Sequence, residues 1–146
     1  MSPVPSDKLS SIYVPLRLVY GLVPIVAGAD KFFNLLTNWS HYIAPMVADR
    51  LPISTAAFMA AVGVIEIVAG LLVLTVLPRL GAYIVAIWLL LISVNLILAG
   101  FYDVAVRDIV MALGAFVLGQ VAAIRGEGWF GNRSLATGTT MHGLAH

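Results

Sequence analysis

The sequence contains no cysteine, and only 10% of its 146 residues are charged. The absence of cysteine excludes disulfide bonds, a thiol redox pair, a thiolate zinc site and an iron–sulfur cluster ligated by this chain. A soluble domain carries about 25% charged residues, so the charged side chains are too few for a water-facing surface. The net charge of +1 provides no electrostatic field that would attract nucleic acid.

Histidine is also scarce, and none of the three histidines lies in an apolar stretch. His41 falls in a connection, while His142 and His146 are near the C-terminus. Haem ligation by two histidines needs both of them within the helices, and the histidine spacing indicates no metal site. We therefore expect no metal, no haem and no covalently bound cofactor in this chain.

Apolar residues, by contrast, make up 61% of the sequence and collect in four long stretches. Each stretch has roughly 18–24 residues, which is enough for a helix to cross a hydrocarbon core about 30 Å thick. The connections after the second and third stretches are very short, so these neighbouring helices must be antiparallel. The sequence therefore predicts an all-α membrane protein, an antiparallel bundle of four transmembrane helices over about 12–30, 54–77, 80–99 and 104–124.

The connection between the first two stretches has a pattern of its own. Its apolar side chains recur at helical spacing, at Trp39, Tyr42, Ile43, Met46, Val47 and Leu51. This spacing indicates a short amphipathic helix over about 39–50 that lies in the membrane interface. The alternative is an irregular loop whose aromatic side chains touch lipid headgroups.

The distribution of lysine and arginine indicates how the bundle is oriented. With both termini in the cytoplasm, five of these residues lie on the cytoplasmic side and three on the other. The five are Lys8, Arg17, Arg79, Arg125 and Arg133, and the three are Lys31, Arg50 and Arg107. We therefore expect both termini to be cytoplasmic. The bundle ends near residue 125, and residues 126–146 form a Gly- and Thr-rich tail that is disordered in isolation or ordered only on a partner.

Two ionisable residues fall deep within the apolar stretches. Arg17 lies in the first stretch and Glu66 is midway along the second. At a helical rise of about 1.5 Å per residue, their depths bring them within reach of each other. Because charges within a membrane usually pair, we predict a buried Arg17–Glu66 ion pair. The alternative is that Arg17 reaches the cytoplasmic surface and Glu66 is protonated.

A second set of polar residues falls at one level near the outer face, namely Asp30, Lys31, Asn95, Arg107 and Asp108. One interpretation is an interhelical salt-bridge network, or simple placement at the interface. The functional interpretation is a polar pocket or proton relay beneath the 39–50 helix. Its aromatic rim would consist of Phe32, Phe33, Trp39, Tyr42 and Tyr102. A mostly apolar cavity with a few convergent polar groups suits a quinone ring.

Three segments carry a family resemblance: LRLVYG through AGADKF over 16–32, GVIEIVAGLL over 63–72, and RDIVM over 107–111. Because these segments occur in this order and with this spacing, the chain resembles the DoxX-like family of small bacterial membrane proteins over about residues 12–125. The resemblance implies a four-helix bundle in the bacterial cytoplasmic (inner) membrane. It also matches Arg17, Lys31, Glu66 and Asp108 to the family's polar pattern without assigning roles to them.

The family is named for a subunit of a thiosulfate:quinone oxidoreductase, and other members accompany redox enzymes as membrane partners. The function we expect is therefore a small membrane subunit of a quinone-linked redox system, which binds quinone or docks a soluble oxidoreductase. The alternative is a non-catalytic assembly or structural subunit that contacts other membrane chains or further copies of itself in the bilayer. A small transporter has least support, because no inverted repeat is evident.

Overall fold

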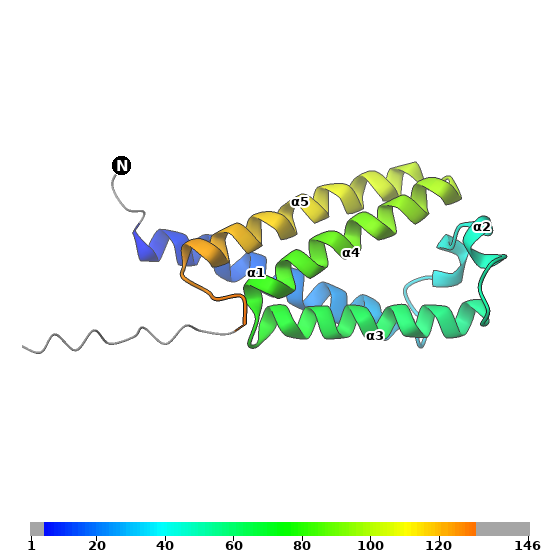
Figure 1. Ribbon diagram of the computed structural model, residues 1–146, viewed down its shortest axis with the longest axis horizontal. Helices are drawn as coiled ribbons and strands as arrows, with labels where there is room; N and C mark the ends of the chain where they lie inside the picture. Colours follow the sequence, from blue (N-terminus) through cyan, green and yellow to red (C-terminus); the bar gives the residue numbers. More distant parts are fainter. Residues whose placement is uncertain (1–4, 131–146) are drawn as a thin grey trace, which may run out of the picture.

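The computed structural model describes residues 5–130, which form four long helices (Figure 1). These are α1 (Ser6–Asp30), α3 (Thr55–Leu74), α4 (Pro78–Ala99) and α5 (Tyr102–Ile124). All four are long and apolar enough to cross a membrane. The predicted all-α class with four transmembrane helices is confirmed. Most of the predicted tail, residues 131–146, lies outside the described residues.

The connection between α1 and α3 is not the single amphipathic helix that the spacing predicts. It contains a 3-10 turn, η1 (Trp39–Tyr42), and one α-helical turn, α2 (Pro45–Ala48). The backbone between the two turns is extended. Pro45 explains the break, because proline has no backbone N–H to continue a preceding helix but fits the first position of a new one. We call residues 31–54 the covering segment.

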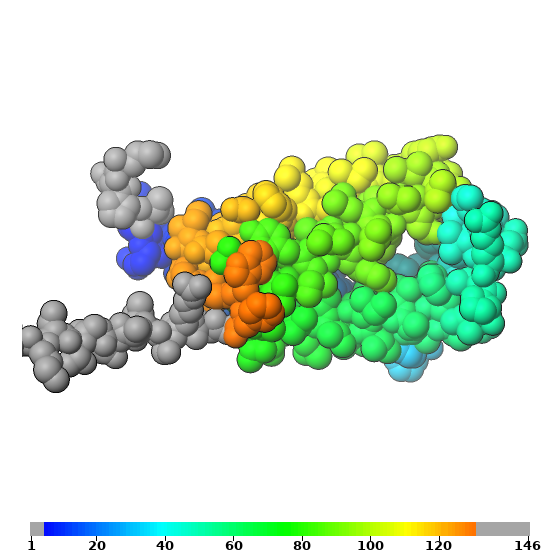
Figure 2. All heavy atoms as spheres, viewed as in Figure 1, coloured from blue at the N-terminus to red at the C-terminus, as the bar shows by residue number. Residues whose placement is uncertain are grey.

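The helices form two antiparallel pairs, α1 with α3 and α4 with α5 (Figure 1). The pairs lie close together where α3 leads into α4, and they diverge toward the end that carries α2. The covering segment lies across this wider end, where it contacts α3 and α4 (Figure 2). The bundle is therefore closed by a short link at one end and by the covering segment at the other.

Glycines allow α1 and α3 to approach each other closely. Gly28 faces Gly63, and a Cβ atom on either residue would lie 2.5 Å from the carbonyl oxygen of the other. Seven residues further along α3, a Cβ on Gly70 would collide with the carbonyl oxygen of Gly21. Small residues are favoured at such contacts because lipid supplies no hydrophobic drive for helices to associate. The α1–α3 contact therefore depends on the absence of side chains at these positions.

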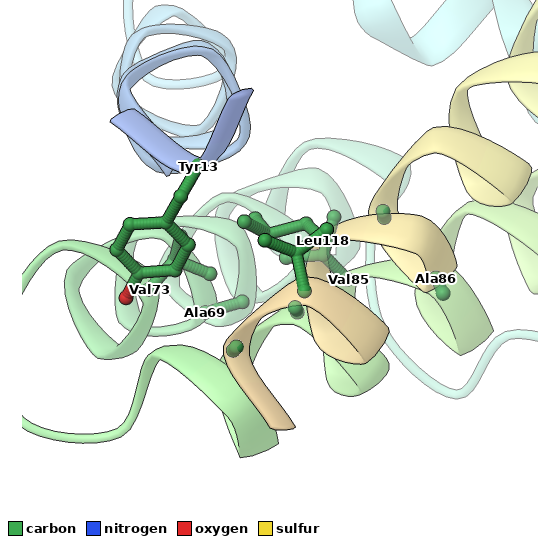
Figure 3. Close-up of a cluster of buried hydrophobic side chains, with 10 residues drawn as sticks. Tyr13, Ala69, Val73, Val85, Ala86 and Leu118 are labelled. Atoms are coloured by element: carbon green, nitrogen blue, oxygen red, sulfur yellow. The ribbon is translucent and has the colours of Figure 1, made fainter. Parts of the chain in front are cut away.

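The core between the two pairs is also built mainly from small side chains (Figure 3). Alanines of α3, α4 and α5 surround Val73, Val85 and Leu118, and Tyr13 of α1 packs against the same cluster. Most of the large apolar side chains on the four helices point outward instead. This distribution is the reverse of that in a soluble bundle, and it fits helices whose outer faces contact acyl chains.

Arg17 holds the narrow end of the bundle together. Its Nε donates to the carbonyl oxygen of Val73 at 2.9 Å, and its Nη2 donates to those of Leu74 at 2.9 Å and Thr75 at 2.8 Å. Carbonyl groups at a helix C-terminus have no partner within the helix, and a cation is favoured there. The predicted Arg17–Glu66 ion pair is therefore wrong. The donors of Arg17 are used at the end of α3, about two turns beyond Glu66.

The α1–α3 contact predicts that Gly63→Ala destabilises the bundle. The added methyl group would force the two backbones apart, and overpacking of this kind costs about 1–3 kcal/mol. Thermal unfolding in detergent should therefore show a lower midpoint for this variant. The control is Ala61→Val, which adds bulk to an exposed position of the same helix and should unfold like the wild type. Equal midpoints for the two variants would contradict the proposed dependence on glycine.

The Arg17 contacts predict that Arg17→Met lowers the free energy of unfolding by about 1–3 kcal/mol, because three carbonyl groups lose their donor. Arg17→Lys should recover only part of this loss, since an ammonium group cannot reproduce the planar fork of a guanidinium. The control is Arg50→Met, which removes a positive charge in the same way but at an exposed position. If Arg17→Met and Arg50→Met unfold at the same temperature, the capping contacts contribute nothing measurable.

Candidate functional site

A buried ion pair lies at the wider end of the bundle, between α1 and α3. Lys31 Nζ is 2.6 Å from Glu66 Oε2, and the two side chains are only 5% and 8% exposed. Lys31 directly follows the last residue of α1, and its Cβ lies beside Gly63 of α3. The close approach of Gly28 and Gly63 therefore places the lysine where its side chain can reach Glu66. The Glu66 carboxylate therefore pairs with Lys31 rather than with Arg17.

Trp39 covers the ammonium group of Lys31. The Nζ atom lies 3.7 Å from the centroid of the tryptophan ring, which is a favourable cation–π arrangement. The indole N–H of Trp39 donates to Asp30 Oδ2 at 2.7 Å. Asp30 also accepts the backbone N–H groups of Leu35 and Leu36. The carboxylate of Asp30 thus fixes the covering segment to the end of α1, with Trp39 placed over Lys31.

Asn95 fixes the covering segment to α4. Its side-chain amide donates to the carbonyl oxygen of Tyr42 at 2.7 Å, and its oxygen accepts the N–H of Ala44 at 3.0 Å. These bonds satisfy the extended backbone between η1 and α2. The ring of Tyr42 also packs on Phe101, with 4.9 Å between the centroids. Asn95 and Tyr42 therefore lie at the covered end, as the sequence predicts, but they attach the covering segment to the helices.

Asp108 of α5 is the second buried carboxyl group at this end, with 9% of its surface exposed. It lies within electrostatic range of both Glu66 and Lys31. Its carboxyl group has no hydrogen-bond partner among residues 5–130 and is not part of the Lys31–Glu66 ion pair. The site thus contains a largely buried carboxyl group that makes no hydrogen bond within the described residues.

Trp88 of α4 adds an unpaired donor to the same region. Its indole Nε1 is buried and lies beside the carboxylate of Glu66, but no hydrogen bond of good geometry joins it to an acceptor within the described part of the chain. Its ring packs on the apolar cluster of Ile43, Met59 and Val62. Sequence reasoning missed this residue. The signal that pointed to it was a tryptophan well inside a transmembrane stretch, where its N–H has no water to bond.

Four of the residues predicted for this site lie outside it. The side chain of Arg107 is 74% exposed, and its contact is with Asp103, one turn away on the same helix, at 4.0 Å. Consecutive helical residues differ in direction by about 100°, so Arg107 points outward where Asp108 points inward. Three predicted rim residues are exposed as well: Phe32, Phe33 and Tyr102. Of the predicted aromatic rim, only Trp39 contacts the ion pair.

The assembled site comprises Lys31, Glu66, Asp108, Trp39 and Trp88. All four long helices contribute to it, and η1 supplies Trp39. Chemically it offers one ammonium group, one carboxylate paired to it, one unpaired carboxyl group and one unpaired N–H donor. All of them lie largely buried between the helices and the covering segment. Such an arrangement can hold a small polar head group, or a proton, within apolar surroundings.

A scan against protein-family models finds DoxX, matched over residues 12–98. The match includes Lys31, Glu66, Trp88 and Asn95 and ends before α5, so that Asp108 lies beyond it. No curated protein and no solved structure matches the chain. The matched region covers more than half of the sequence and contains the Lys31–Glu66 pair together with three of the four membrane-spanning helices. The chain therefore belongs to the DoxX family of membrane proteins.

Proposed function

We propose that this protein is the membrane subunit of a quinone-linked redox system, and that it binds a quinone head group at Asp108 and Trp88 beside the Lys31–Glu66 pair. The observation that carries the proposal is the pair of unpartnered polar groups in the apolar bundle. A buried N–H or carboxyl group without a hydrogen bond costs about 1–3 kcal/mol. A ligand that satisfied both groups would recover this free energy.

The chemistry of a quinone fits these groups. Each of its two carbonyl oxygens accepts hydrogen bonds, and each takes up a proton when the ring is reduced. The indole N–H of Trp88 is a donor for one oxygen, and the carboxyl group of Asp108 is placed to exchange a proton. The Lys31–Glu66 pair supplies a dipole beside them. Because the chain has no cysteine, we propose that electrons come from a partner oxidoreductase that docks on this subunit.

An apolar groove between α4 and α5 supports the proposal further. Its volume is about 590 Å³, and nearly all of its surface is carbon, contributed by residues such as Tyr83, Leu90, Leu113 and Phe116. Ala112, which also lines it, lies one turn from Asp108 on the same face of α5. The lining includes none of the polar groups themselves, and an apolar groove of this kind suits the isoprenoid tail that anchors a quinone in the bilayer.

The test is quinone binding by the protein in lipid nanodiscs. Asp108→Asn and Trp88→Phe should each weaken binding of a short-tailed quinone about 5- to 100-fold, the effect of losing one buried hydrogen bond. The controls are Asp103→Asn and Trp129→Phe, because both residues are exposed. They should bind as the wild type does. Binding is measured by the quenching of tryptophan fluorescence and by mass spectrometry of extracted quinone.

Two results would contradict the proposal. One is a wild-type protein that neither retains quinone on purification nor binds it when it is added. The other is unchanged binding in both Asp108→Asn and Trp88→Phe. If quinone is absent while other membrane chains copurify in mild detergent, the assembly-subunit alternative gains support instead.

We further propose that the protein lies in the bacterial inner membrane with both termini in the cytoplasm, which would place the covering segment on the outer side. The absence of native cysteine makes this testable with single introduced cysteines. A thiol reagent that does not cross membranes should label Asp49→Cys in intact spheroplasts and should label Asp7→Cys only after lysis. The reverse pattern would show that the covering segment faces the cytoplasm.

A further inference from the structure

The buried charges at the covered end of the bundle do not cancel. Two carboxyl groups, Glu66 of α3 and Asp108 of α5, lie within electrostatic range of a single ammonium group, that of Lys31 at the end of α1, and Lys31 pairs with Glu66. No other lysine or arginine within residues 5–130 is buried. The third carboxyl group at this end, Asp30, is satisfied by N–H groups of the covering segment. The side chains that α4 contributes here, Trp88 and Asn95, carry no charge.

This imbalance has a large electrostatic cost. Removing an unpaired carboxylate from water costs several kcal/mol even after the protein relaxes. A second negative charge near the first raises the cost further, because Coulomb interactions are poorly screened in an apolar interior. A carboxyl group in this position avoids the penalty by holding a proton. Asp108 is the group concerned, since Glu66 already has Lys31 at 2.6 Å.

We propose that the site binds one exchangeable proton, held on Asp108 while Lys31 pairs with Glu66, so that the three groups together are neutral. Lys31 is then shared between two carboxyl groups. Its flexible side chain carries a point charge without a preferred plane, so it can turn to Asp108 when the proton moves to Glu66. Both arrangements contain one ion pair and one neutral acid. The proposal does not require a quinone.

The direct test is infrared spectroscopy of quinone-free protein in nanodiscs at neutral pH. A protonated carboxyl group has a C=O stretching band that is separate from carboxylate bands and shifts when hydrogen is exchanged for deuterium. The wild type should show one such band. Asp108→Asn should lose it, whereas Asp103→Asn, which alters an exposed acid on the same helix, should retain it.

Two further variants test whether Lys31 is shared. In Glu66→Gln, Lys31 should turn to Asp108, which then ionises, so the band should disappear although Asp108 is still present. In Lys31→Met, neither carboxyl group has a counter-ion, so the band should grow to about twice its wild-type intensity. A wild type without the band, or a Glu66→Gln variant with the full band, would overturn the proposal.

Thermal unfolding provides a second measurement. Glu66→Gln and Asp108→Asn each leave Lys31 with one carboxylate partner, so each single variant should lose little stability. The double variant leaves the ammonium group buried and unpaired, and its midpoint should fall by clearly more than the sum of the two single losses. Additive losses would contradict the sharing of Lys31. Because no quinone is present in either experiment, a failed quinone assay leaves these results unaffected.

Discussion

The arrangement of the wider end of the bundle is organised around one ion pair, the contact between Lys31 and Glu66, in apolar surroundings where a buried charge has a high free-energy cost. Attraction between two charges compensates for their removal from water only when the geometry is close and the remaining polar atoms are satisfied. Several features supply that geometry. The glycines of α1 and α3 bring the backbones together, and Trp39 covers the ammonium group. The covering segment thus shields the ammonium group beneath it.

The two ends of the bundle stabilise a cationic side chain in different ways. At the narrow end, Arg17 is surrounded by backbone carbonyl groups, which satisfy its donors without a second charge. At the wider end, Lys31 has a carboxylate, and a further carboxyl group lies nearby. Carbonyl groups have a fixed protonation state, whereas carboxyl groups do not. The narrow end is therefore suited to a structural role, and the wider end to binding and releasing a proton.

Much of the fold was predictable because lipid imposes a simple constraint. A stretch of about 20 apolar residues must be a helix, and the short links then determine which helices are antiparallel. The burial of Glu66 also follows from its depth, whereas depth alone left Asp108 either in a pocket or at the interface. The helical spacing of the apolar residues around Pro45 predicts one helix, but the missing N–H of this proline divides the segment into two short turns.

The details of the site were less predictable, because depth along a helix is only one of the coordinates that decide a contact. Arg17 and Glu66 have compatible depths, yet the rotation of α1 and the carbonyl groups at the end of α3 give Arg17 other partners. Arg107 and Asp108 share a level, but the first points outward and the second into the bundle. The depth of its Cα places Lys31 near the interface, whereas its long side chain reaches inward to Glu66.

The attachments of the covering segment have a mechanical consequence. Asp30 ties the segment to α1, and Asn95 ties it to α4, so that it acts as a strap between the two helix pairs. The pairs cannot spread at this end without breaking one set of bonds. If a neighbouring protein displaced α4 and α5, the covering segment would therefore transmit the displacement to Trp39. The exposure of the Lys31 ammonium group beneath Trp39 would then change.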